Sequence, residues 1–353
     1  IESGADVSAI TKDRRTALQV AQQHGRTAIV DLLKGRTPSP KATPTGRPID
    51  DKLIGAVNYG DKQRVEELLT RGARINAIDA DRKTVLMCAA RNAEAGVIDL
   101  LIERGARLDL TDSHNRNALS YAIARENLDI ITLLINKGLD INSRDSSGRS
   151  PLMIAAMQGN KDAAQVLIEK GVRLNAQDLD GKTALMMASE TGDLDMMQFL
   201  LDKGANINTQ DRSGRTPFMA ALEKGGLEAA NLLLTRKANL NLTDNLGRTA
   251  LVIAACEGSL DMVNLLLDRG ADIETRLCDG STIFKATARA PESVRRLLLE
   301  RALHLEAKAK HSLFETMLAE ACELSDAEQV KTLLDRGTNP NPASQRSKAP
   351  LMI

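Results

Sequence analysis

Aromatic residues are scarce in this 353-residue chain: they make up 2% of it, and tryptophan is absent. Stacking sites for single-stranded nucleic acid depend on aromatic side chains, and a dedicated nucleic-acid surface needs an excess of basic charge. Lysine and arginine number 47 against 47 aspartates and glutamates, so the formal net charge is zero. We therefore expect no nucleic-acid partner.

Histidine, cysteine and long apolar runs are scarce as well. The four histidines and four cysteines show no metal-ligand spacing, and no phosphate-binding loop, nucleophile elbow or dinucleotide fingerprint occurs. No apolar run approaches the length of a membrane span. We expect a monomer that is not an enzyme and has no metal, no cofactor and no membrane insertion. The unpaired cysteine spacing favours a reducing, cytoplasmic location.

A polar residue recurs every 33 residues through most of the chain. It opens a short phrase in which alanine or proline usually precedes an apolar residue, as in Thr183-Ala184-Leu185. The phrase opens at Thr84, Asn117, Ser150, Thr183, Thr216, Thr249 and Thr282. A fixed period of this size indicates one supersecondary unit copied along the chain. Such units bury their faces on their neighbours rather than in one globular core.

Local signals in each unit predict two short helices. Thr183 is a good N-cap, and Pro151 and Pro217 directly follow caps, where a missing N–H costs nothing. The second helix ends at a glycine such as Gly204, which suits a left-handed residue. Lys237 stands at this place in one unit, so we expect a strained cap there. Helices this short must be stabilised by stacking.

These units resemble the ankyrin repeat. The fullest one runs Asp178-Leu-Asp-Gly-Lys-Thr-Ala-Leu185, followed by Ala188, Gly192 and the segment Gly204-Ala-Asn-Ile-Asn208. The resemblance implies an all-α repeat solenoid in which each unit is a β-hairpin finger followed by an antiparallel helix pair. It also implies protein binding along the concave side formed by the fingers and the first helices.

One position departs from the ankyrin pattern. The family usually places histidine three residues after the cap, where it bonds back to the cap amide. Methionine stands there in four units, at Met87, Met153, Met186 and Met219. Because a thioether is a weak acceptor, we expect the reciprocal cap to be weaker by about 0.5–1 kcal/mol per unit.

Proline content and breaks in the repeat phrase divide the chain. Residues 1–35 are expected to end a preceding ankyrin array, and the Pro/Thr-rich residues 36–48 to form a linker, either a plain spacer or a phosphorylation target. The main array is predicted at 49–306, and 307–353 should begin a further, truncated array. We predict interrupted stacking at 36–48 and near 302–312.

The fingers carry a regular charge pattern in which an aspartate precedes a basic residue by four positions. The basic residues are candidates for gripping an acidic partner: Arg116, Arg149, Lys182, Arg215 and Arg248. The alternative, which we favour, is that these residues pair with the aspartates across neighbouring fingers and hold the hairpins in register. It predicts that Asp145, Asp178 and Asp211 lie within salt-bridge distance of a basic residue on the same or a neighbouring finger.

The last residues of each first helix should face the concave groove by register. The candidates are Arg91, Asn92, Arg125, Met157, Gln158, Glu190, Thr191, Glu223, Lys224, Cys256 and Glu257. Other methionines, such as Met196 and Met262, are predicted to fill the core. The row runs from basic to acidic, which would orient an extended ligand, unless Lys224 and other neighbours neutralise it locally.

The sequence therefore predicts a non-catalytic scaffold that binds one or more proteins through its groove and fingers. The alternative is a targeting or regulatory arm of a larger enzyme, effector or channel whose other domains lie outside these residues. A mechanical spacer is a third hypothesis, for which a featureless groove would be the signature. The identity of the partner does not follow from repeats, because function depends on the surface site rather than the fold.

Overall fold

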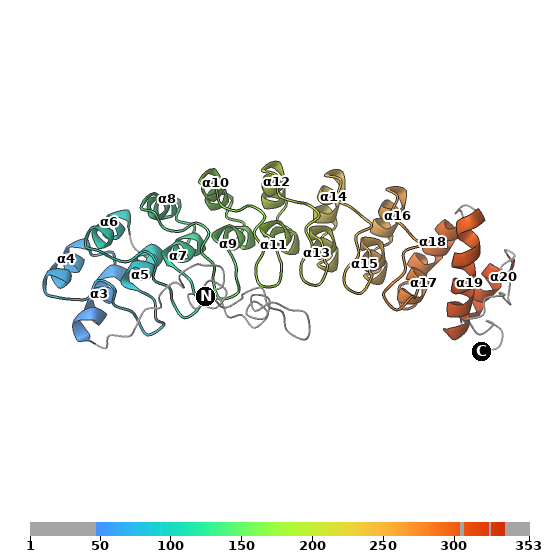
Figure 1. Ribbon diagram of the computed structural model, residues 1–353, viewed down its shortest axis with the longest axis horizontal. Helices are drawn as coiled ribbons and strands as arrows, with labels where there is room; N and C mark the ends of the chain where they lie inside the picture. Colours follow the sequence, from blue (N-terminus) through green and yellow to red (C-terminus); the bar gives the residue numbers. More distant parts are fainter. Residues whose placement is uncertain (1–46, 93, 304–306, 325, 336–353) are drawn as a thin grey trace, which may run out of the picture. The chain divides into compact units, whose positions relative to one another are not determined.

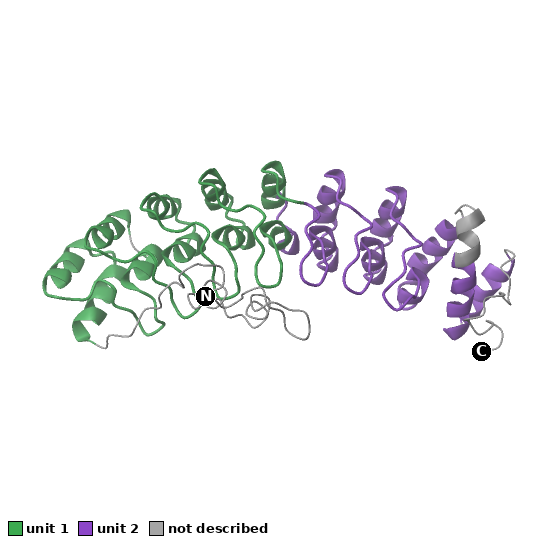
Figure 2. Ribbon diagram, viewed as in Figure 1, with its two compact units in different colours: residues 1–188, 195–206 green, residues 189–194, 207–353 purple. Residues whose placement is uncertain are grey.

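The computed structural model describes residues 47–92, 94–303, 307–324 and 326–335 (Figure 1). The array predicted at 1–35 and nearly all of the predicted linker lie outside these residues. The chain divides into two compact units (Figure 2). Unit 1 comprises the residues up to 188 together with 195–206, and unit 2 comprises 189–194 and the residues from 207 onwards.

Unit 1 is built from helix pairs. Their bounds are α3 Pro48–Asn58, α4 Lys62–Thr70, α5 Val85–Asn92, α6 Ala95–Glu103, α7 Ala118–Ala124, α8 Leu128–Asn136, α9 Pro151–Met157, α10 Lys161–Glu169, α11 Ala184–Thr191 and α12 Leu194–Asp202, with the end of α11 assigned to unit 2. The first helices α3, α5, α7 and α9 contact one another in order, and the second helices α4, α6, α8 and α10 form a row beside them (Figure 1). The predicted repeat of stacked helix pairs is confirmed.

Unit 2 continues the same plan. Its helices are α13 Pro217–Glu223, α14 Leu227–Thr235, α15 Ala250–Cys256, α16 Leu260–Asp268, α17 Ile283–Ala286, α18 Glu292–Leu303, α19 Ala307–Glu323 and α20 Ala327–Asp335. Helix α19 contacts α17, and the buried Glu320 of α19 accepts hydrogen bonds from the amide (2.8 Å) and the hydroxyl of Thr282. The array boundary predicted at residue 306 falls among residues 304–306, which are not described.

Small and unbranched side chains fill the space between the helices. Ala155, Ala221 and Ala254 are at most 1% exposed, which lets paired helices approach closely. Met196 and Met262 are buried, as predicted. Burying apolar side chains on neighbouring repeats stabilises helices that would not form alone.

The fingers are hairpin turns rather than strands in the part of the chain that the structure describes. In each regular finger the aspartate amide donates to the carbonyl of the basic residue four positions on, as from Asp145 to Arg149 (3.1 Å). Backbone bonds also join neighbouring fingertips: Leu179 donates to Ser147 in unit 1 (3.0 Å), and Asn245 to Ser213 in unit 2 (2.9 Å). Backbone hydrogen bonds therefore join neighbouring fingertips from residue 114 to 179 in unit 1 and from 213 to 278 in unit 2.

Close contact between fingertips leaves no room for a side chain at glycines such as Gly247. A Cβ added to Gly247 would lie 2.7 Å from the Cys278 nitrogen and 2.8 Å from the Leu277 Cα, whereas one added to Gly270 would meet no atom within 4 Å. Both glycines have left-handed φ angles, 79° and 83°. We expect Gly247→Ala to destabilise unit 2 by about 1–3 kcal/mol more than Gly270→Ala, measured by urea denaturation. Equal losses would show that the fingertip contact contributes nothing.

Methionine sulfur takes the acceptor position left by the missing histidine. The Thr84 amide lies 3.4 Å from the Met87 Sδ, and the Ser150 amide lies 3.3 Å from the Met153 Sδ. In return, the amide of each methionine donates to the cap hydroxyl, at 3.2 and 3.3 Å. The reciprocal cap is therefore formed with a thioether, so the expected weakening concerns the strength of the bond and not its presence.

Lys237 occupies a left-handed backbone conformation, with φ at 61°, where the other second helices from α4 to α16 are followed by glycine. A side chain in this conformation costs about 1–2 kcal/mol. We expect Lys237→Gly to raise the free energy of unfolding of unit 2 by about 1 kcal/mol. Arg269, one position before the equivalent glycine, has φ at −92°, so Arg269→Gly should instead lower stability. A Lys237→Gly variant with unchanged stability would contradict the account of the cap.

Candidate functional site

In unit 1, three of the predicted site residues line one cleft of about 690 Å³. Arg91 and Arg125 stand at the ends of α5 and α7, and Arg116 comes from a finger. Asp81, Arg82 and Lys83 of the preceding finger also line it. We call this cleft, defined by Asp81, Arg82, Lys83, Arg91, Arg116 and Arg125, the basic groove.

Arg91 and Arg125 are the exposed cations of the groove. Arg91 lies in the last turn of α5 and Arg125 is the C-cap of α7, where the helix dipole favours positive charge. The Arg125 Nε donates to the Arg91 carbonyl oxygen at 3.2 Å, which helps to fix the position of the guanidinium. Within the described ranges, no ion pair joins either arginine to a carboxylate.

The finger cations of the groove, in contrast, are paired. Arg116 lies 2.8 Å from the Asp112 carboxylate, and Lys83 lies 2.7 Å from Asp81 and 3.7 Å from Asp79. The hydrogen bond with Asp81 raises the pKa of the Lys83 ammonium. These contacts leave Lys83 and Arg116 locally compensated.

A buried hydrogen-bond network underlies the groove. The Tyr121 hydroxyl donates to Asp112 Oδ2 at 2.7 Å, and the Arg116 guanidinium stands 4.9 Å above the Tyr121 ring centroid. Asp112 Oδ1 also accepts from the amides of His114 and Arg116, at 2.8 and 2.9 Å. Burial would raise the pKa of Asp112, but the hydrogen bonds from Tyr121 and Arg116 outweigh it and lower the pKa. The network holds the finger and the groove wall in one geometry.

An exposed tyrosine, Tyr59, lies at the C-terminal end of α3, beside the end of α5. Asn92 Nδ2 donates to Asn58 Oδ1 at 3.0 Å, so the end of α3 lies beside the end of α5. Tyr59, the next residue, is 91% exposed. Sequence reasoning missed Tyr59 because α3 lacks the repeat phrase, although the register of Asn58 with Asn92 could have identified it.

The remaining candidates of unit 1 lie outside the groove lining. Met157 is 43% exposed at the end of α9, as its register predicted, and the exposed Gln158 caps that helix. Arg149 donates to Asp145 at 2.8 Å and also lies 3.7 Å from the Met157 sulfur. The Lys182 amide donates to Asp178 Oδ1 at 2.8 Å.

The predicted ion pairs form at Asp145 and Asp211, but each lies within one finger rather than across neighbouring fingers, so alignment of the fingers by these pairs stays a prediction. Asp145 pairs with Arg149 at 2.8 Å and Asp211 with Arg215 at 2.9 Å, both within a single finger. Burial raises the pKa of Asp178, although amide bonds from Lys182 and Asp180 oppose the shift. The prediction of an ion pair at Asp178 stays a prediction.

In unit 2, one carboxylate of the predicted acidic row, that of Glu223, is compensated by finger arginines. Glu223 accepts from Arg215 at 2.8 Å and from Arg248 at 3.4 Å. Arg248 also pairs with Asp244 at 2.7 Å. The alternative of local neutralisation therefore holds at Glu223, through Arg215 and Arg248 rather than through Lys224.

Other candidates at helix ends are exposed to different degrees. Glu190 is half-buried at the end of α11, while Thr191, Lys224, Cys256 and Glu257 are exposed. The Cys256 thiol lies 3.7 Å from the Ala286 carbonyl oxygen, and partial desolvation of the sulfur, in a residue that is otherwise exposed, raises its pKa. A raised pKa keeps this thiol protonated at neutral pH and therefore a poor nucleophile.

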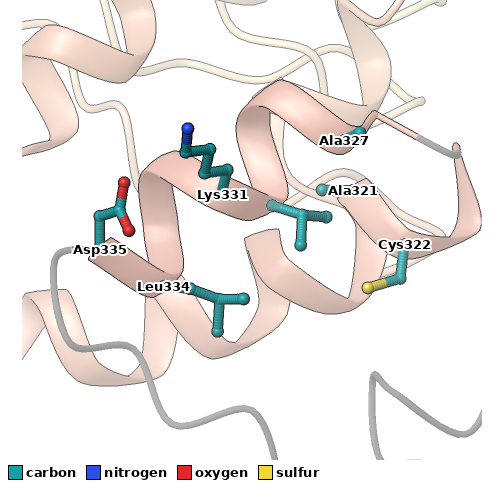
Figure 3. A pocket seen from close by; sticks show the side chains of 7 residues that line it. Ala321, Cys322, Ala327, Lys331, Leu334 and Asp335 are labelled. Atoms are coloured by element: carbon teal, nitrogen blue, oxygen red, sulfur yellow. The ribbon is translucent and has the colours of Figure 1, made fainter.

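Unit 2 has clefts as well, and two of them contain no predicted site residue. One, of about 360 Å³, lies between α19 and α20, with Ala321, Cys322, Ala327 and Leu334 around it (Figure 3). The other, of about 810 Å³, is lined by parts of α17, α18 and α20. Arg91, Arg116 and Arg125 of unit 1 are thus predicted site residues that share one cleft.

Two other kinds of feature, a group of metal ligands and a membrane-spanning helix, are absent from the described residues. No three histidine, cysteine, aspartate or glutamate side chains there are grouped to hold a metal ion. None of its helices combines the length and the apolar character needed to cross a membrane.

A family model described as ankyrin repeats, in three copies, matches residues 53–145, 137–211 and 205–277. No curated protein sequence matches the chain significantly. The matched residues cover more than half of the chain and extend from within α3 to beyond the end of α16. Ankyrin repeats are generally protein-interaction modules without catalytic activity of their own. The chain belongs to the ankyrin-repeat family.

Proposed function

We propose that this chain is a protein-binding scaffold and that a partner lies against the fingers and first-helix ends of unit 1. The observation that carries the proposal is the pair of exposed arginines, Arg91 and Arg125, which have no carboxylate partner in the described ranges. Tyr59 lies beside this row with 91% of its surface exposed. Tyrosine and arginine are the residue types enriched where alanine substitution most weakens protein interfaces.

The contrast with unit 2 supports the same choice. There the helix-end Glu223 is already engaged by Arg215 and Arg248, so a partner would have to break existing ion pairs. A partner that binds Arg91 and Arg125 would break no ion pair of these two arginines in the described ranges. A surface whose charged groups need not leave existing partners, and whose side chains are already ordered, binds at a lower free-energy cost.

The proposal is tested by site-specific photo-crosslinking. A photoreactive residue is placed at Ala124, which is exposed and lines the basic groove, and separately at Glu103, which is exposed at the end of the second helix α6. We expect the Ala124 variant to crosslink one or a few proteins reproducibly in cell extract, and the Glu103 variant to miss them. Identical crosslinked proteins at both positions, or none at Ala124, would contradict the proposal.

A further inference from the structure

We infer that the basic groove binds an extended segment of a partner protein rich in aspartate and glutamate. The inference rests on the proposed function and adds the chemistry of the partner. Zero net charge over the whole sequence conceals this local character. Charge complementarity at such a surface sets specificity and the rate of association.

The groove has an uncompensated positive charge. Its lining holds Arg82, Lys83, Arg91, Arg116 and Arg125 against Asp81 alone. Asp79 and Asp112 lie beneath the lining and compensate Lys83 and Arg116. Arg91 and Arg125 remain at the helix ends with their charge uncompensated by any ion pair in the described ranges.

The polar groups of the groove select a ligand that accepts hydrogen bonds. The Tyr121 hydroxyl is engaged with Asp112, and burial raises its pKa, so it stays protonated and does not serve the ligand. The groups that remain for a ligand are mainly guanidinium N–H donors, which bind carboxylates in a fork geometry. The Arg125 Nε donates to the Arg91 carbonyl oxygen at 3.2 Å, so this side chain has already lost part of its conformational entropy before a ligand binds.

The form of the groove favours a peptide over a nucleic acid. Two fingers and two helix ends enclose about 690 Å³, which suits several residues of extended chain. Nucleic acid would need stacking platforms, and Tyr59 is the only aromatic residue among the exposed large apolar side chains of the described chain. Carboxylates on an extended peptide match the arginines without requiring stacking.

The test measures binding of a fluorescent acidic peptide to the full chain by anisotropy. The probe is a peptide of about a dozen residues of mixed glutamate and aspartate, and its control is the glutamine and asparagine peptide of the same length. We expect the acidic peptide to bind at low ionic strength, the amide peptide not to bind, and the affinity to fall with added salt as charges are screened over about 10 Å at 0.1 M.

Matched charge reversals locate the binding. Arg91→Glu with Arg125→Glu should weaken binding of the acidic peptide by about tenfold or more. Arg74 and Arg173 are exposed arginines of unit 1 outside the groove lining. The control variant, Arg74→Glu with Arg173→Glu, changes the net charge equally and should bind within about twofold of the unsubstituted chain. Arg91→Gln with Arg125→Gln, checked for fold by circular dichroism, provides a milder variant that should also weaken binding.

Three results would overturn the inference: equal loss of affinity in the groove and control variants, equal binding of the amide peptide, or displacement of the acidic peptide by single-stranded oligonucleotide at lower concentration than by unlabelled peptide.

The inference and the proposed function fail separately. A protein crosslinked at Ala124 without acidic-peptide binding removes the inference alone. Groove-dependent peptide binding without any protein crosslinked at Ala124 removes the proposed function.

Discussion

Replacing Asp112 with asparagine is expected to lower the free energy of unfolding of unit 1 by about 2–3 kcal/mol, while Asp178→Asn changes it by less than about 0.5 kcal/mol. The two aspartates occupy the same place in their fingers, and both accept two backbone amides. Only Asp112 also accepts the Tyr121 hydroxyl and the Arg116 Nε, at 2.7 and 2.9 Å. In Asp112→Asn, an amide Nδ2 at the position of Oδ2 could not accept these two hydrogen bonds, because it is itself a donor.

The two carboxylates should also affect the pH dependence of stability in opposite directions. Asp112 has a lowered pKa, so its contribution is fully present above the unfolded pKa of about 3.9 and is lost as pH falls through the folded value. Asp178 has a raised pKa, so stability falls as pH rises from the unfolded to the folded value. Asp112→Asn should flatten the acid side of the stability profile, and Asp178→Asn should remove the opposite slope.

Tyrosine fluorescence during guanidinium denaturation measures these effects, because the chain has only two tyrosines, Tyr59 and Tyr121, both in unit 1. Equal destabilisation by the two asparagine variants would show that the Tyr121 and Arg116 contacts add nothing to the shared turn. A common pH profile would show that the carboxylates titrate alike.

Glu320→Ala is expected to destabilise unit 2 by about 2–3 kcal/mol, because it leaves the buried amide and hydroxyl of Thr282 without their acceptor. Glu323→Ala, three residues further along α19, is the matched control. Glu323 pairs with Lys285 at 2.8 Å on the exposed surface, and such a pair contributes about 0–1 kcal/mol.

Urea denaturation followed by helical circular dichroism compares the two variants of α19. A loss at Glu320 no larger than that at Glu323 would show that the buried carboxylate does not stabilise the start of α17. The predicted difference would instead establish that α19 replaces a cap which other repeats make locally.

The repeat architecture follows from the sequence because its signals are local. The Thr183 hydroxyl, for example, accepts a hydrogen bond from the Met186 amide at 3.3 Å, as its cap position predicts. Lys237 likewise adopts the left-handed conformation that its place in the period requires. Cap, turn and spacing each depend on a few neighbouring residues.

Contacts between distant residues were not predictable in the same way. Glu320 meets Thr282 across 38 positions, outside any repeat phrase. Glu223 was expected to present a free charge or to be neutralised by neighbours such as Lys224, and only the orientation of the Arg215 and Arg248 side chains identifies its partners. Charge compensation in the site is therefore a property of side-chain geometry, which register alone does not give.

The most direct test of the central claim uses a protein crosslinked at Ala124, purified and titrated against three forms of the full chain. We predict that Arg91→Glu with Arg125→Glu lowers its affinity by about tenfold or more, and that Arg74→Glu with Arg173→Glu leaves it within about twofold of the unsubstituted chain. Equal affinity for all three forms would contradict the assignment of the basic groove of unit 1 as the partner-binding surface.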